Sequence, residues 1–159
     1  MKTIVIYASK KGATREVAEK IKERLESADV RNISQIKEIQ LGDYETVIIG
    51  SSVYAGGINK EIKTLAKKNI ALLMQKRLGL FLCGLQPQEA DKVFNANFPA
   101  EIVKHANAKD ILGGIYDPAK SGAIARYLMK KVAKLTEYTN TIDDTKINEF
   151  ANPFMRKGD

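Results

Sequence analysis

The sequence contains only one cysteine, Cys83, only one histidine, His105, and no tryptophan. A lone cysteine excludes an internal disulfide bond. No run of apolar residues approaches the roughly 18 residues that a membrane-spanning helix needs. Residues 1–3 lead directly into a strand pattern, so we expect no signal peptide. These absences predict a cytoplasmic protein.

Several motifs of common binding sites are missing as well. The first loop holds a single glycine, Gly12, so it is neither a Walker phosphate loop nor a dinucleotide-binding loop. The positions after the first and third predicted strands carry no carboxylates, which excludes the magnesium site of a response-regulator receiver. The sequence shows no metal-ligand spacing, no acid–base pair and no nucleic-acid motif. We therefore predict no metal site, no catalytic acid–base residue and no nucleic-acid partner.

Acidic residues are outnumbered: the sequence has 19 Asp and Glu against 26 Lys and Arg, and its net charge is +7. A basic surface indicates an acidic partner, such as an acidic protein, an anionic membrane or an anionic small molecule. The length of 159 residues and the hydrophobic content of 44% are typical of one globular domain. We expect residues 1–159 to form a single domain.

The chain does have a phosphate-loop pattern near its N-terminus. An apolar run, residues 4–8, and the start of an amphipathic helix flank a short loop. The loop reads Ser9-Lys10-Lys11-Gly12-Ala13-Thr14. Unpaired N–H groups and the helix dipole favour a phosphate at such a helix N-terminus. The loop resembles the FMN phosphate loop of flavodoxins, [ST]-x-[TS]-G-x-[TS], except that Lys11 replaces a hydroxyl residue; the alternative is a plain helix cap.

Apolar runs of strand length alternate with amphipathic helix patterns along the chain. The five predicted strands are Thr3–Ala8, Val30–Ile33, Thr46–Ser51, Leu78–Cys83 and Asp110–Tyr116. The predicted helices are Thr14–Ser27, Ile58–Lys68, Glu89–Ala106 with an interruption at Pro99, Lys120–Leu135 and Lys146–Ala151. This alternation predicts an α/β fold, a flavodoxin-like, doubly wound, five-stranded parallel sheet of order 2-1-3-4-5 with helices on both faces.

In that strand order the loops after the first, third and fourth strands meet at the carboxyl edge of the sheet, where ligands bind. We therefore expect one cofactor site from three loops. Its predicted members, besides residues 9–14, are Ser51, Ser52, Val53, Tyr54, Ala55 and Gly56, followed by Cys83, Gly84, Leu85 and Gln86. Tyr54 offers an aromatic face to a ring, and the small residues allow close approach of a backbone. The alternative is an ordinary turn for each later loop and a small core residue for Cys83.

Residues 2–21, 47–55 and 113–150 carry a wider resemblance. The last segment combines Gly113-Gly114-Ile115-Tyr116-Asp117-Pro118 with a basic helix. Together they resemble the flavodoxin-domain family that includes the bacterial menaquinone-dependent protoporphyrinogen oxidase. The resemblance implies FMN as cofactor and an FMN-dependent oxidoreductase, with a redox protein or a quinone- or porphyrinogen-like molecule as partner. The alternative is a non-enzymatic flavodoxin that carries electrons to acidic redox partners.

The predicted helix Lys120–Leu135 is basic and has an apolar stripe. Its cations are Lys120, Arg126, Lys130, Lys131 and Lys134, and its stripe is Ile124, Leu128, Val132 and Leu135. We expect the stripe to pack on the sheet with the lysines in water; the alternative is peripheral contact with an anionic inner membrane face. Because this region follows the fifth strand, we expect residues 116–135 to flank the cofactor loops and to govern partner choice rather than FMN binding.

Overall fold

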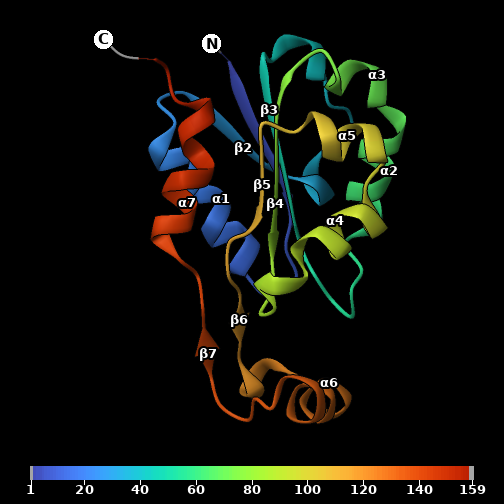
Figure 1. Ribbon diagram of the computed structural model, residues 1–159, viewed down its shortest axis with the longest axis vertical. Helices are drawn as coiled ribbons and strands as arrows, with labels where there is room; N and C mark the ends of the chain where they lie inside the picture. Colours follow the sequence, from blue (N-terminus) through green and yellow to red (C-terminus); the bar gives the residue numbers. More distant parts are fainter. Residues whose placement is uncertain (1, 158–159) are drawn as a thin grey trace.

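The computed structural model describes residues 2–157, which form a parallel sheet of five strands flanked by helices. The strand order is β2-β1-β3-β4-β5 (Figure 1), which confirms the predicted fold class. The strands are β1 Thr3–Ala8, β2 Ala28–Asn32, β3 Thr46–Ser52, β4 Arg77–Cys83 and β5 Ala108–Ile111. Each neighbouring pair is parallel, so the carboxyl ends of all the strands lie at one edge.

Helices cover both faces of this sheet (Figure 1). One face carries α1 Ala13–Arg24 and α7 Asp144–Ala151. The other carries α2 Lys60–Lys68, α3 Ile70–Leu73, α4 Ala90–Asn97 and α5 Ala100–His105. Short 3₁₀ turns occur at Ile33–Gln35, Leu41–Asp43, Pro87–Glu89, Pro118–Lys120 and Asn152–Phe154.

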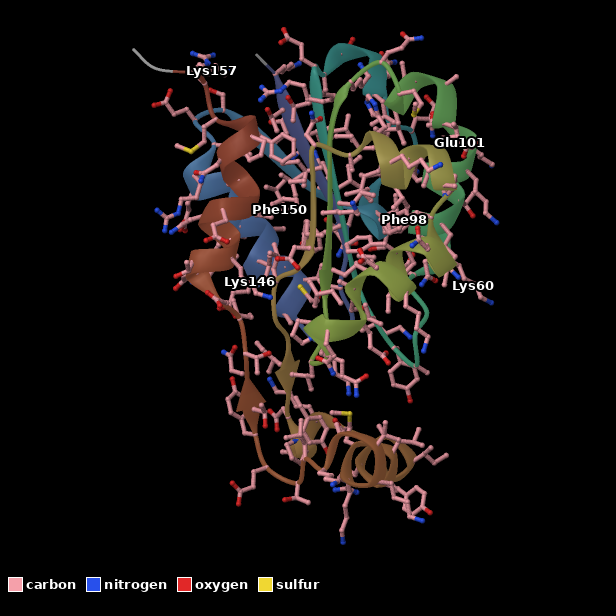
Figure 2. The ribbon with its side chains drawn as sticks, viewed as in Figure 1. Lys60, Phe98, Glu101, Lys146, Phe150 and Lys157 are labelled. Atoms are coloured by element: carbon pink, nitrogen blue, oxygen red, sulfur yellow. The ribbon has the colours of Figure 1, made fainter. Side chains whose placement is uncertain are left out.

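Alternate residues of the central strands contribute to two separate cores, one on each face of the sheet. In β1, Ile4 and Ile6 belong to the core under α2 to α5, whereas Val5 belongs to the core under α1 and α7. Figure 2 shows Phe98 and Phe150 on opposite sides of the sheet. Every residue of β1 is buried, which explains its continuous apolar run.

The predicted helices are present, with shifted ends. The helix predicted from Ile58 begins at Lys60, because Asn59 Oδ1 accepts from the backbone N–H groups of Glu61 and Ile62, at 2.8 and 3.2 Å. The region Glu89–Ala106 forms two helices, α4 and α5, which meet at Pro99. The short helix α3 was not predicted from the sequence.

The predicted fifth strand, Asp110–Tyr116, is wrong in extent. The parallel strand β5 ends at Ile111, and a separate strand, β6 Ile115–Tyr116, pairs antiparallel with β7 Thr139–Asn140. The break coincides with Gly113, whose φ of +95° takes the chain out of the extended conformation. The apolar run therefore continues through two different sheets.

Residues 115–140, which we call the arm, project beyond the carboxyl edge of the main sheet (Figure 1). The arm carries α6 Ala123–Leu128 and a π-helical turn, Met129–Ala133, so the helix predicted over Lys120–Leu135 is shorter and less regular. The apolar stripe does not pack on the sheet as expected. Ile124 and Val132 are 76% and 69% exposed, because the arm lies beyond the sheet rather than on it.

Candidate functional site

The first element of the site is the open N-terminus of α1. Gly12 is its N-cap with a φ of +96°, and no side chain caps the helix. The Gly12 N–H donates to Ser9 Oγ at 3.0 Å, and the first helical bond runs from Glu16 N–H to Gly12 O, at 3.0 Å. The N–H groups of residues 13–15 therefore lack acceptors within the helix, which favours an anion at this point.

Thr14, the last residue of this loop, lies in the first turn of α1. Its Oγ1 is buried and has no hydrogen-bond partner within residues 2–157. Burial raises the pKa of the neighbouring Cys83 thiol to about 12, while the Thr14 hydroxyl lowers that pKa in part. Cys83 is therefore a neutral core thiol at physiological pH. Apart from this weak interaction with the Cys83 thiol, the Thr14 hydroxyl has no hydrogen-bond partner within the described residues, and it is the kind of group that a bound ligand satisfies.

The loop after β3 presents Tyr54, whose side chain is 61% exposed. Tyr54 and Gly57 exchange two backbone hydrogen bonds, each of 2.9 Å, which close a tight turn. Ser51 is fully buried, and its Oγ donates to Ser52 O and accepts from Asn59 N–H, both at 3.1 Å. Ser51 therefore holds its own loop together.

The loop after β4 lies against both the β3 loop and the base of the arm. Val53 N–H donates to Cys83 O at 2.9 Å, and Gly84 N–H donates to Gly113 O at 3.1 Å. A Cβ placed on Gly114 would lie 3.0 Å from the carbonyl carbon of Gly84, so this approach needs a residue without a side chain. These contacts bring the predicted loops together at one edge of the sheet.

A cavity of about 360 Å³ lies between these loops and the arm. The predicted site residues that line it are Ser9, Lys10, Lys11, Ala13, Thr14, Ser52, Val53, Tyr54, Cys83, Gly84 and Leu85. An adjoining cavity of about 260 Å³ is lined by the predicted residues Ala55, Gly56 and Gln86. Gly12 and Ser51 line neither cavity, although both shape the loops that do.

Sequence reasoning missed the contribution of the arm and its base to this cavity. The added lining residues are Gly114, Ile115, Tyr116, Ser121, Ala125 and Met129. The position of this segment after the last strand predicted only that it would flank the cofactor loops. The apolar residues of this segment line the cavity together with Val53 and Leu85. Two cations, Lys10 and Lys11, line the end of the cavity next to α1. The cavity thus suits a molecule with an anionic group at one end and an apolar ring at the other.

The lining of this cavity includes no carboxylate. Within residues 2–157, no group of three or more His, Cys, Asp or Glu side chains is placed to hold a metal ion. No helix of that same stretch has the length and hydrophobicity needed to cross a bilayer.

Comparison with known proteins agrees with this geometry. A family model described as flavodoxin domain matches residues 4–143. Protoporphyrinogen IX dehydrogenase (quinone) of Escherichia coli strain K12 is 28% identical over 96 residues, which are 58% of this chain and 53% of that protein. The chain thus spans about half the length of the curated relatives it matches.

Solved structures share the fold. A short-chain flavodoxin associated with a PDU bacterial microcompartment gives a TM-score of 0.60 at 17% identity, over 96% of this chain and 95% of that one. The FMN-bound flavodoxin of Fusobacterium nucleatum gives 0.52 at 13% identity, over 96% of each chain. The family model covers most of the sequence, and the sheet order is the one predicted for this class. The chain belongs to the flavodoxin domain family.

Proposed function

We propose that this protein binds FMN in the cavity between the three loops and the arm. The phosphate occupies the loop 9–14, where backbone N–H groups and the cations of Lys10 and Lys11 favour a dianion. The observation that carries the proposal is the uncapped N-terminus of α1, with Gly12 at positive φ and the unpaired Thr14 hydroxyl beside it. Two structural relatives, the flavoprotein of Lactobacillus acidophilus and the flavodoxin of Fusobacterium nucleatum, hold FMN.

The ring of the cofactor fits the apolar part of the same cavity. Val53, Tyr54, Leu85 and Met129 line that part. Tyr54 supplies an aromatic face, and Met129 a polarisable thioether. FMN supplies redox chemistry when bound, while these residues orient the ring and exclude water from it.

We further propose that the protein is an FMN-dependent oxidoreductase. The arm supports this, because Ala125 and Met129 line one side of the cavity and leave an open site that a small molecule can reach. The named activity of the Escherichia coli relative suggests a porphyrinogen or a quinone as the partner molecule. The second candidate is an electron carrier for acidic redox proteins, which the net charge of +7 favours.

The arm also suits contact with an anionic membrane surface. Between residues 118 and 136 it has five basic residues and no acidic residue. Ile124, Tyr127 and Val132 are 76%, 57% and 69% exposed on the same segment. Exposed apolar side chains among cations are typical of segments that lie at a lipid surface.

Fluorescence titration of the purified chain with FMN tests the cofactor assignment. We expect 1:1 quenching of flavin fluorescence and a bound-flavin visible spectrum. Binding no tighter than the background of an unrelated basic protein would reject the assignment. Turnover assays then separate the two functions: an oxidoreductase reacts directly with a quinone or a porphyrinogen, whereas a carrier passes electrons only to a redox protein.

A further inference from the structure

The arm reaches over the cofactor cavity with little packing to hold it there. Neither α6 nor the π-helical turn contains a buried residue. Ala125, Met129 and Ala133 are half-buried and face the two cavities, whereas Ile124 and Tyr127 are exposed. Because so little apolar surface is buried, the position of the arm depends strongly on polar contacts near its base.

One such contact joins the arm to the phosphate loop. Lys11 Nζ donates to Ser121 Oγ at 3.1 Å, across 110 residues of sequence. Ser121 is 9% exposed, and its Oγ donates to Asp117 O at 2.8 Å. One hydroxyl can accept from the ammonium while it donates to the carbonyl. The contact fixes Ser121, two residues before α6, relative to the N-terminus of α1.

We propose that Lys11 is a positioning residue that couples the phosphate of the cofactor to the arm. This rests on the proposed FMN site. An ammonium has three N–H donors, so Lys11 serves both Ser121 and a phosphate bound beside Gly12. The bound phosphate therefore stabilises the position in which Ala125 and Met129 cover the ring.

The departure of Lys11 from the flavodoxin loop pattern supports this role. A threonine hydroxyl sits on Cβ, several bonds short of the lysine Nζ, and does not span the distance to Ser121. Coupling between two sites is reciprocal, so the Lys11–Ser121 contact also strengthens binding of a phosphate-bearing flavin. Lys22 is exposed in the last turn of α1, lines neither cavity and forms no hydrogen bond to the arm within the described chain, which makes it a control.

Limited proteolysis of the full chain with trypsin measures the coupling. The arm offers exposed cleavage sites at Lys120, Arg126, Lys130, Lys131 and Lys134. A protease needs a locally unfolded segment, so cleavage within the arm, followed by mass spectrometry, reports how often the arm loosens and opens. Loss of one hydrogen bond is expected to raise that rate about 2- to 12-fold.

Four variants give the comparison without ligand. We expect Lys11→Thr and Ser121→Ala to speed cleavage of the arm, and Lys22→Thr to leave its rate unchanged. Lys11→Arg keeps a cationic donor and should keep most of the protection. The melting temperature of each variant is measured in parallel, since general unfolding would expose sites outside the arm as well.

The same assay with inorganic phosphate or FMN tests the coupling itself. Both ligands should slow cleavage of the wild-type arm, and the slowing should be several-fold smaller in Ser121→Ala. Equal protection of wild type and Ser121→Ala by FMN would overturn the coupling, as would faster cleavage with FMN. If Lys11→Thr and Ser121→Ala cleave at the wild-type rate without ligand, Lys11 does not position the arm. Failure of FMN to bind the wild type would instead reject the flavin assignment, and the coupling with it.

Discussion

Asn97 Nδ2 donates a hydrogen bond of 2.8 Å to Gly56 O, which ties α4 to the loop that presents Tyr54. Asn97 is 5% exposed and also donates to Val93 O at 2.8 Å. The loop needs this support, because Ala55 and Gly56 both have positive φ values, of 49° and 75°. A buried amide thus holds the aromatic side chain of the site in place from a distance.

Replacing Asn97 should therefore affect both stability and the site. We expect Asn97→Ala to lower the free energy of unfolding by about 1–3 kcal/mol, because Gly56 O loses a buried donor. FMN affinity should fall as the Tyr54 loop loosens. Urea denaturation and flavin titration measure the two effects. Asn95→Ala, at an exposed position of the same helix, is the control and should change neither.

Thr14→Val tests the unpaired hydroxyl of the last residue of the phosphate loop. Without ligand, we expect stability to stay the same or rise slightly, because valine has a similar shape and removes a buried group that lacks a partner. FMN affinity should fall about ten-fold or more, since a charge-assisted hydrogen bond to the phosphate is lost. Thr14→Ser keeps the hydroxyl and should retain most of the affinity. Equal FMN affinity in wild type and Thr14→Val would show that the hydroxyl makes no contact with the phosphate.

The buried thiol of Cys83 predicts a loss of stability in alkali. Its pKa is raised from 9.0 to about 12 in the folded chain, so the folded state keeps the proton that the unfolded chain releases above pH 9. The contribution is fully present below pH 9 and is lost as pH rises toward 12. Between pH 8 and pH 10 we expect a loss of about 1 kcal/mol in the free energy of unfolding. Cys83→Ala should lack this part of the pH dependence in urea titrations at both pH values.

Charge on the arm should control binding to anionic vesicles. Replacing Lys130, Lys131 and Lys134 with Gln should reduce co-sedimentation, because each cation near an anionic lipid surface contributes about 1 kcal/mol. The visible spectrum of bound flavin should not change. The control makes the same charge change on α2 and α5, at Lys67, Lys68 and Lys104, and should retain vesicle binding. Equal loss in both triple variants would indicate a general charge effect instead of a surface on the arm.

The strand order was predictable because each buried central strand is marked in the sequence by a continuous apolar run. In β3, Val47, Ile48 and Ile49 form an apolar run that only a strand covered on both faces requires. The arm was not predictable in the same way. Its strand β7 has two residues, Thr139 and Asn140, and neither has a hydrophobic pattern to mark it. The apolar stripe that includes Ile124 and Val132 does not reveal from sequence alone whether it packs on the sheet or faces solvent.

Some residues of the site were predictable from the sequence and others were not, for the same reasons. Loops such as residues 9–14 follow strands directly, so the order of the sheet predicts where they meet. Ser121 and Met129 reach the cavity only because the arm turns back over the sheet edge, which depends on contacts between distant residues. Asn97 follows the buried Val93 and Phe94 by four and three residues, so helical spacing places it on the inner face of α4, but nothing local shows that its amide reaches the loop of Gly56.

The base of the arm determines how freely the length and sequence of the arm can change. Thr141 N–H donates to Gly114 O at 2.8 Å, and Thr141 Oγ1 accepts from Gly114 N–H at 3.0 Å, so the two ends of the arm meet. A segment whose ends already meet can be lengthened, shortened or exchanged at small entropic cost, without shifting the register of β5 or the packing of α7. The arm can thus be replaced between Gly114 and Thr141 by another segment, while the rest of the fold and the phosphate loop stay unchanged.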